Sequence, residues 1–259
     1  MPFIETKTEC AVGTICLRHE EKRNALSAAL VEDMLGALES FAGERVRAVV
    51  LRAKPGVKIW SAGHDVGELP EARRDPLGWL DPLRRLIRAI EGHPAPIIAM
   101  IEGGVWGGAC EAAMACDIIV AAENATFALT PAKLGVPYNV SGMLTFLNGA
   151  PLRLIKEMAF TAKPISAERA LAAGLVNHVL RVEEIERFTY AMAEEIAANA
   201  PLSIAVMKEE LRMLADAHPM SPQGFERVQG LRRIVYDSAD YVEGLKAFKE
   251  KRKPVYRGE

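Results

Sequence analysis

The chain has 259 residues, of which about half are hydrophobic and about a quarter are charged, as in ordinary globular proteins. Its formal net charge of −2 excludes the strongly basic surface that is typical of nucleic-acid-binding and membrane-surface proteins. It contains no apolar run near the ~20 residues that cross a bilayer and no signal-peptide pattern at its start. Its four cysteines show no metal-ligand spacing. We therefore expect a cytoplasmic protein without a metal, whose cysteines are reduced and mostly buried.

The first half of the chain is predicted to alternate strands and helices. Strands are expected at 3–7, 11–17, 47–52, 97–101 and 117–122, and helices at 27–41, 79–91 and 109–116. Ser27 has the character of an N-cap, and the second helix places Leu80, Leu83, Leu86, Ile87 and Ile90 on one face. A strand, a glycine-rich turn, a helix and a further strand follow one another, which predicts an α/β fold built from ββα units.

From about residue 151 the chain is predicted to be almost entirely helical. Helices are expected at 152–160, 167–173, 183–199, 202–215, 222–236 and 239–249. We expect residues 1–199 to form the core and residues 200–259 to form a helical C-terminal subdomain for packing and oligomerisation.

Two glycine-containing turns are the first candidates for chemistry. One is Ser61-Ala62-Gly63-His64-Asp65, which follows an expected strand, and the other is Gly107-Gly108-Ala109-Cys110-Glu111, which opens an expected helix. Glycine allows backbone N–H groups to approach a ligand closely, and a helix N-terminus favours an anion. Each turn alone is better explained as ordinary turn chemistry. Neither matches the dinucleotide or P-loop fingerprints.

Taken together and in order along the chain, these motifs resemble the crotonase superfamily, the enoyl-CoA hydratase/isomerase fold. The matching stretches are Asn24-Ala25-Leu26-Ser27, the two glycine turns, Pro96-Ile97-Ile98-Ala99, Cys116-Asp117, Phe127, Leu134-Gly135-Val136-Pro137 and residues 170–176. The resemblance implies a crotonase-like ββα superhelix core that binds an acyl-CoA. It also implies that the amides of His64 and Gly108 hydrogen-bond the thioester oxygen, and that the coenzyme A path is lined by Ala62, Gly63, His64, Asp65 and Val66.

Hydratases of this superfamily use two glutamates as acid and base, and this chain matches only one of them. The first position is Glu111, but the second falls on Pro131, which has no ionisable group. Glu111 is therefore either a proton-transfer residue acting alone or a first-turn glutamate that stabilises its helix. The His64 side chain is likewise open: it acts directly, or only its amide is used.

The segment 130–139 resembles one branch of the superfamily, the methylmalonyl-CoA decarboxylases, through Thr130, the missing glutamate and Tyr138. That resemblance implies that Tyr138 orients the substrate carboxylate, that Thr130 contacts substrate and that Lys251 reaches a coenzyme A phosphate. The structural alternatives are a pocket-rim aromatic, a turn threonine and a cation at a helix end. No cofactor is expected, and similar proteins suggest a homotrimer or homohexamer. A hydratase, an isomerase, a thioesterase and a non-catalytic acyl-CoA-binding protein remain the competing hypotheses.

Overall fold

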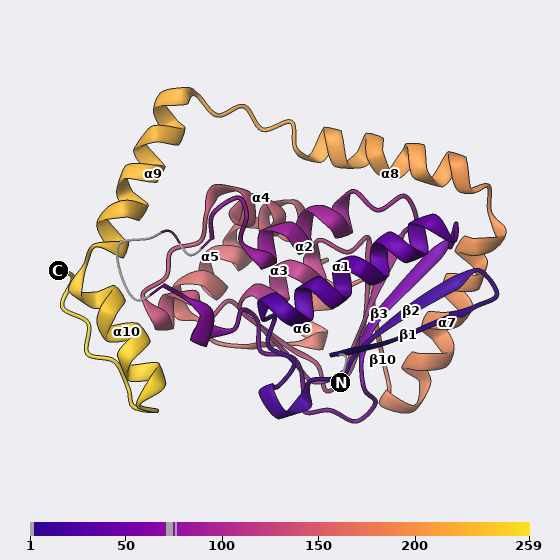
Figure 1. Cartoon of the computed structure of the whole chain (residues 1–259), viewed down its shortest axis with the longest axis horizontal. Coiled ribbons are helices and arrows are strands. Elements are labelled where there is room, and N and C mark those ends of the chain that lie inside the picture. The colour runs from indigo at the N-terminus through magenta and orange to yellow at the C-terminus, as the bar shows by residue number, and fades with distance from the viewer. Residues whose placement is uncertain (1–2, 71–74, 76) are drawn as a thin grey trace.

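The computed structural model describes residues 3–70, 75 and 77–259, and Figure 1 shows a mixed α/β body with its last helices at the periphery. The helices and strands, in chain order, are β1 (Ile4–Glu9), β2 (Val12–Leu17), α1 (Ala28–Gly43), β3 (Ala48–Ala53), β4 (Ile59–Ser61), α2 (Pro82–Glu91), β5 (Ile97–Ile101), β6 (Gly104–Trp106), α3 (Gly108–Met114), β7 (Ile118–Ala122), β8 (Thr126–Ala128), α4 (Val140–Gly149), α5 (Leu152–Thr161), β9 (Ile165–Ser166), α6 (Ala167–Ala172), β10 (His178–Leu180), α7 (Val182–Ala198), α8 (Pro201–Ala215), α9 (Pro222–Tyr236) and α10 (Ala239–Lys249).

The strands form two sheets. The six-stranded sheet has the order β1-β2-β3-β5-β7-β10, and the four-stranded sheet has the order β4-β6-β8-β9. The pairs β1–β2 and β8–β9 are antiparallel, and the other pairs are parallel. Successive turns of the chain give one strand to each sheet: β3 and β4, then β5 and β6, then β7 and β8. This is the ββα repeat that the sequence predicted.

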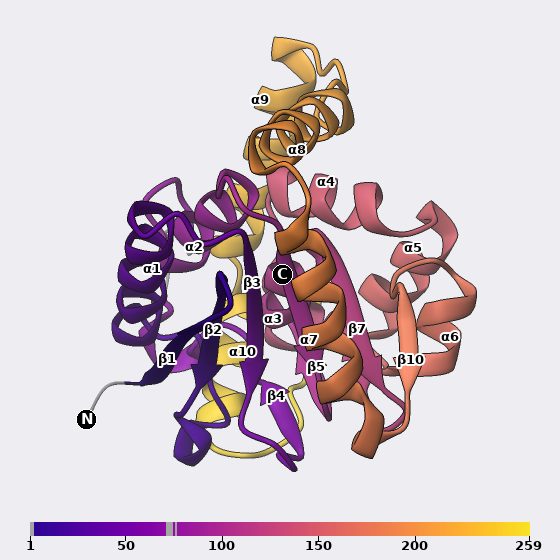
Figure 2. The same ribbon diagram turned by 90° about the vertical axis from the view of Figure 1, so that its right-hand side faces the viewer.

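The central strands are buried on both faces. Every residue of β3 and β5 is buried, as expected for parallel strands covered on each side, which read as nearly continuous apolar runs. Helix α7 covers one face of the six-stranded sheet, as Figure 2 shows, and α1 to α3 pack on the other side. The small sheet and the helices of successive turns therefore share one core.

Two helix starts show how local sequence sets these elements. The Ser27 side chain accepts a hydrogen bond from the Leu30 amide and caps α1, as predicted. The second helix was predicted to begin at 79 but begins at Pro82, because Asp81 caps it and proline favours the first helical position. The prediction that Leu80 lies on the buried face was wrong: its side chain is 79% exposed.

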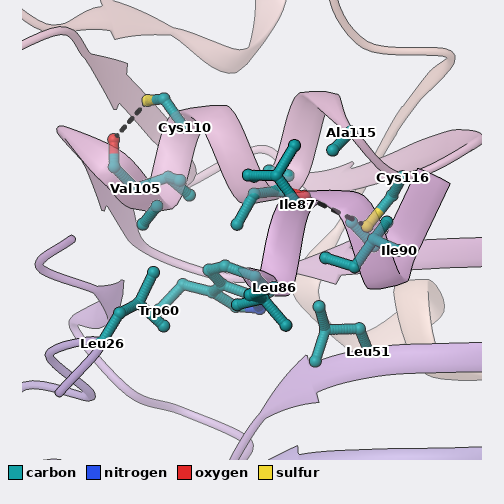
Figure 3. Close-up of a cluster of buried hydrophobic side chains, with 14 of the residues drawn as sticks. Leu26, Leu51, Trp60, Leu86, Ile87, Ile90, Val105, Cys110, Ala115 and Cys116 are labelled. Atoms are coloured by element: carbon teal, nitrogen blue, oxygen red, sulfur yellow. Dashed lines mark hydrogen bonds between the residues drawn. The ribbon is translucent and has the colours of Figure 1, made fainter. Parts of the chain in front are cut away.

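Figure 3 shows part of the core that lies between α2, α3 and the strands. Trp60 is fully buried and its indole N–H donates to the Met100 carbonyl at 2.9 Å. Cys110 and Cys116 are buried thiols, and each donates to a backbone carbonyl. All four cysteines are free, as predicted, but Cys10 is exposed at the β1–β2 turn, so the expectation of burial fails there.

The C-terminal helices lie where the sequence predicted helices, although the position of α4 was missed. Helix α8 runs along the outside of the body in both views (Figures 1 and 2) and is tied to it by Lys208, whose ammonium contacts Asp117 at 2.7 Å. Helix α10 returns to the body and packs against residues 131–134. No helix in the described ranges is long and apolar enough to span a membrane. Residues 1–2, 71–74 and 76 of the predicted core lie outside the described residues.

Candidate active site

Three parallel strands of the small sheet end side by side and bring the predicted motifs together. Ser61 of β4 pairs with Val105 of β6, and Trp106 of β6 pairs with Ala128 of β8. The loops that follow these strands begin at residues 62, 107 and 129. Because the carboxyl ends of parallel strands meet at one edge of a sheet, that edge is where α/β proteins build ligand sites. Both glycine turns and Thr130 therefore share one edge.

The first loop is fixed by the segment that precedes α1. The Ser61 hydroxyl donates to the Asn24 carbonyl at 2.7 Å and accepts from the Gly63 amide at 3.2 Å. The buried Asn24 amide group donates to the Trp60 carbonyl at 2.9 Å, and the Leu26 amide donates to the Gly63 carbonyl at 2.8 Å. These contacts explain why residues 24–27 and 61–65 appear together in the sequence pattern.

The approach of the two turns requires glycine. Gly63 has a φ of +86°, and a Cβ there would lie 2.3 Å from the Trp106 carbonyl oxygen and 2.8 Å from the Gly108 nitrogen. Gly107 has a φ of +55°, and a Cβ there would lie 2.9 Å from the Thr130 hydroxyl oxygen. Side chains at these positions would both strain the backbone and overlap neighbouring atoms. The sequence cue of paired glycine turns thus has a steric origin.

Two backbone amides lie close together at this edge. Gly108 opens α3, and a Cβ built on it would lie 3.3 Å from the His64 nitrogen. Neither the His64 nor the Gly108 N–H donates a hydrogen bond to any described residue. Buried backbone donors are almost always satisfied, so two neighbouring amides without a protein acceptor form a ready site for a ligand oxygen.

The His64 side chain lies between two acceptors. Its Nε2 is 2.9 Å from an Asp81 carboxylate oxygen, and its Nδ1 is 3.1 Å from the Asp65 carbonyl oxygen. Burial alone would lower the pKa of His64, but the hydrogen bonds and charge of these partners raise it above the ordinary value. The ring uses both nitrogens as donors when it is the imidazolium. Sequence reasoning missed Asp81, although its place before Pro82 marked it as a cap.

Glu111 is held by a partner that sequence reasoning also missed. Its carboxylate forms an ion pair with the Arg84 guanidinium, and both side chains are almost completely buried. Burial raises the pKa of Glu111 to about 7, with the charge of Arg84 opposing and Glu91 and Asp81 reinforcing the rise. The available sequence signal was Arg84 itself, a charged residue on the apolar face of α2, three positions before Ile87.

Tyr138 lies beside Glu111. A Cβ built on Gly142 would be 2.9 Å from the Tyr138 ring and 3.0 Å from a Glu111 carboxylate oxygen. The Tyr138 hydroxyl is buried without a hydrogen-bond partner among the described residues, and its ring packs edge-on against Phe146. Burial raises the pKa of Tyr138 well above its ordinary value, so the hydroxyl stays protonated. Because an unpaired buried donor is costly, it is a candidate ligand contact.

The other predicted residues divide into two groups. Ala62, Asp65 and Val66 lie in the first loop, where the Ala62 amide donates to the chain before α1 and Asp65 pairs with a lysine side chain at 3.2 Å. Lys251 is exposed just beyond α10 with a φ of 53°. In the described ranges no contact joins its side chain to the other predicted site residues.

Comparison with known proteins finds relatives that match nearly the whole chain. The family model described as enoyl-CoA hydratase/isomerase matches residues 7–259. Methylmalonyl-CoA decarboxylase of Escherichia coli (strain K12) is 50% identical over 256 residues, which cover 99% of this chain and 98% of that protein. Carnitinyl-CoA dehydratase of Salmonella typhi is 34% identical over 244 residues, which cover 92% of each chain.

Two solved structures are similar along nearly the whole chain. A methylmalonyl-CoA decarboxylase in complex with 2-nitronate-propionyl-CoA has a TM-score of 0.98 at 50% identity and 99% coverage of each chain. A methylmalonyl-CoA decarboxylase complexed with 2S-carboxypropyl CoA has a TM-score of 0.98 at 49% identity, with 100% of this chain and 99% of that chain covered. These similarities confirm the predicted fold class.

Proposed function

The chain belongs to the enoyl-CoA hydratase/isomerase family, and we propose that it decarboxylates methylmalonyl-CoA to propionyl-CoA and CO2 without a cofactor. The similarity to methylmalonyl-CoA decarboxylase over 99% of the chain supports this activity, as do the solved relatives bound to acyl-CoA analogues. The observation that carries the chemistry concerns the two positions at which hydratases of this family have glutamates. Glu111 is buried in an ion pair with Arg84, and Pro131 occupies the other position, so the site offers donors in place of a carboxylate pair.

Decarboxylation is a reaction that such a site can promote. The bond between Cα and the carboxylate carbon breaks, its electron pair enters the thioester and forms an enolate, and CO2 departs. A proton added at Cα then gives propionyl-CoA. No base is needed to begin this sequence. The protein must hold the carboxylate out of the thioester plane and stabilise the enolate oxygen.

We propose that the amides of His64 and Gly108 donate hydrogen bonds to the enolate oxygen. Their adjacency and their lack of described protein acceptors support this assignment. Preorganised donors aimed at a developing negative charge are worth ~10²–10³ in rate each.

We assign the orientation of the substrate carboxylate to Tyr138, with Thr130 as a second contact. The buried Tyr138 hydroxyl without a partner supports the first assignment. Thr130 lies beside Gly107, next to the proposed enolate site, which supports the second. Both groups are neutral, so they direct the carboxylate by hydrogen bonds while leaving its charge free to pass into the thioester.

The coenzyme A portion is assigned to the first loop and the C-terminal tail. Residues 62–66 lead from the proposed enolate site toward the surface, because Gly63 is buried and Asp65 and Val66 are partly exposed. Lys251 is an exposed cation on the tail, and we propose that it contacts a coenzyme A phosphate. Residues 200–259 remain a proposed unit for packing and oligomerisation.

The activity is tested by incubating the protein with methylmalonyl-CoA and following propionyl-CoA by chromatography. Tyr138→Phe removes the hydrogen bond that we propose holds the carboxylate out of the thioester plane, and misplacement of a reacting group by about 1 Å can cost ~10²-fold in rate, so we expect kcat to fall by up to ~10²-fold. Tyr190→Phe is the matched control, because its hydroxyl lies 2.9 Å from the Thr14 hydroxyl and its ring packs in the other core cluster, away from Tyr138. Absence of propionyl-CoA above background would remove the proposal, and equal loss in both variants would remove the role of Tyr138.

One observation favours a second candidate, a hydratase or isomerase that uses Glu111 alone. The pKa of about 7 for Glu111 suits proton transfer near neutral pH. Crotonyl-CoA hydration at a rate comparable with decarboxylation, abolished in Glu111→Gln, would support that candidate. Tight coenzyme A binding by calorimetry with no turnover of any thioester would instead support a non-catalytic binding protein.

We also propose that the chain forms a homotrimer or homohexamer through α8 and α9. Large apolar side chains are exposed along these helices: Leu202, Val206, Met207, Leu211, Met213, Leu214, Phe225, Leu231 and Ile234. Exposed apolar patches of this kind mark interfaces. Light scattering should give a mass that is a multiple of 28.3 kDa. This mass should fall in Leu211→Glu and persist in Glu210→Lys; a monomeric wild type contradicts the proposal.

The four free cysteines support the proposed cytoplasmic location.

A further inference from the structure

We infer that Tyr236 and Arg232 of α9 are positioning residues for Tyr138, and that they act through hydrogen bonds to the chain on both sides of it. The inference rests on the proposed function, because it concerns the group assigned to the substrate carboxylate. Both residues are buried, with exposures of 3% for Tyr236 and 5% for Arg232. They lie about 100 residues along the chain from the group that they would position.

The first connection reaches the residue before Tyr138. The Tyr236 hydroxyl is 3.1 Å from the Pro137 carbonyl oxygen, and an Arg232 guanidinium nitrogen is 3.0 Å from the same hydroxyl. A guanidinium can only donate and a carbonyl can only accept. The hydroxyl must therefore accept from Arg232 and donate to Pro137, which fixes its orientation. Burial raises the pKa of Tyr236 above its ordinary value, so this donor persists at neutral pH.

The second connection reaches the residue after Tyr138. The same Arg232 nitrogen donates to an Asp75 carboxylate oxygen at 2.7 Å, and that oxygen also accepts the Leu77 amide at 2.9 Å. The Leu77 carbonyl in turn accepts the Asn139 side-chain amide at 3.0 Å. A closed circuit of hydrogen bonds therefore runs from Arg232 to both neighbours of Tyr138.

This circuit matters because no described residue hydrogen-bonds the hydroxyl of Tyr138. Its hydroxyl has no described partner, so the position of that oxygen depends on the ring packing and on the backbone that carries it. The ring lies against Phe146, with centroids 5.0 Å apart, and against Gly142. The chain on either side is held by the Pro137 carbonyl and by the Asn139 side-chain amide. Misplacement of a catalytic group by about 1 Å can cost ~10²-fold in rate, so the circuit controls turnover.

Tyr241 supplies a matched control within the same helical hairpin. Its ring packs edge-on against Tyr236, with centroids 5.4 Å apart, and its hydroxyl donates to the Pro70 carbonyl at 2.8 Å. Tyr241 and Tyr236 therefore make the same kind of bond, a phenol to a proline carbonyl. Only the bond of Tyr236 ends on the peptide next to Tyr138.

The experiment measures kcat and KM for methylmalonyl-CoA in Tyr236→Phe, Tyr241→Phe, Tyr138→Phe and the double variant of residues 138 and 236. We expect Tyr236→Phe to lower kcat about tenfold with KM within about twofold, and Tyr241→Phe to change neither by more than about twofold. In the double variant we expect no further loss beyond that of Tyr138→Phe, because residues that act through one another are not additive.

Multiplied losses in the double variant, or equal losses in Tyr236→Phe and Tyr241→Phe, overturn the inference while leaving the proposed function intact. A wild type that forms no propionyl-CoA instead refutes the proposed function. Asp75→Ala breaks the second connection at an exposed position, so it serves if thermal unfolding shows that Tyr236→Phe does not fold. It carries the same expectation: a lower kcat in the native background and no further loss beside Tyr138→Phe.

Discussion

Removing the guanidinium of Arg84 tests whether it controls the ionisation of Glu111. Glu111 has a pKa of about 7 in the folded chain against an ordinary value of 4.5. At ~1.36 kcal/mol for each pH unit, this difference corresponds to about 3 kcal/mol. The folded state binds the extra proton between these values, so this stability is fully present below pH 4.5 and is lost as the pH rises through about 7.

Arg84→Met should make this dependence steeper. The charge of Arg84 lowers the pKa of Glu111, so without it the pKa rises above 7 and the carboxyl stays neutral to higher pH. Where the native pair would be charged, breaking a buried ion pair by removing one partner costs ~3–5 kcal/mol. Below pH 6 Glu111 is neutral in both proteins, and we expect only the smaller penalty for lost packing.

Urea unfolding at pH 5, 6, 7 and 8 measures the effect, with Glu111→Gln and the Arg84→Met/Glu111→Gln double variant alongside. The double variant lacks the titrating carboxyl, so its loss of stability relative to Glu111→Gln should not vary with pH. A penalty for Arg84→Met that is the same at pH 5 and pH 8 would refute the reasoning. A pH dependence that survives in the double variant would assign it to another group.

Two further predictions concern the first loop. Gly63→Ala should lower the rate of decarboxylation by ~10² or more, because a Cβ would lie 2.3 Å from the Trp106 carbonyl oxygen. Gly56 is the control: it has a φ of +75° but open space around it, so Gly56→Ala should reduce stability alone. Equal activity in both variants would contradict the steric argument. Asp81→Asn should lower the pKa of His64, measured by NMR titration, because burial remains while the opposing carboxylate is lost; an unchanged pKa would show that Asp81 does not control the ring.

Long elements with a clear period were predictable from sequence, and very short ones were not. The helix that begins after Ser27 and the strand Ile97–Ile101 carry a cap or a continuous apolar run, and both lie where they were expected. Strands β4, β6 and β8 have three residues each, too few to display a period of two. Their existence depends on pairing with one another, which is a tertiary effect.

Helix α4 was missed for a different reason. It contains Gly142 and Gly149 and follows directly on Pro137 and Tyr138, and glycine lowers helix propensity. The usable signal was Asn139, whose side chain accepts the Gly142 amide at 2.7 Å and caps the helix. Gly142 is required by packing, since a side chain there would displace both Tyr138 and Glu111.

The candidate site residues were predicted from sequence motifs, whereas the residues that hydrogen-bond or ion-pair with them were not. Gly63 and Gly108 belong to local patterns that can be read along the chain. Arg84 lies 27 residues from Glu111, and Arg232 lies 157 residues from Asp75. Such pairs are set by which helices pack together, so a single sequence cannot reveal them.

On the proposed assignment, the neutrality of Tyr138 is part of the mechanism. The substrate enters with its charge on the carboxylate and reaches the enolate with that charge on the thioester oxygen. A cation beside the carboxylate would stabilise the bound substrate. Because that interaction disappears as CO2 forms, it would raise the barrier to decarboxylation. A tyrosine whose pKa is raised by burial gives direction without a full charge, and the nearby Arg84 cation is already paired with Glu111. The amides of His64 and Gly108 then gain strength as the reaction proceeds, so the fixed donors favour the transition state over the bound substrate.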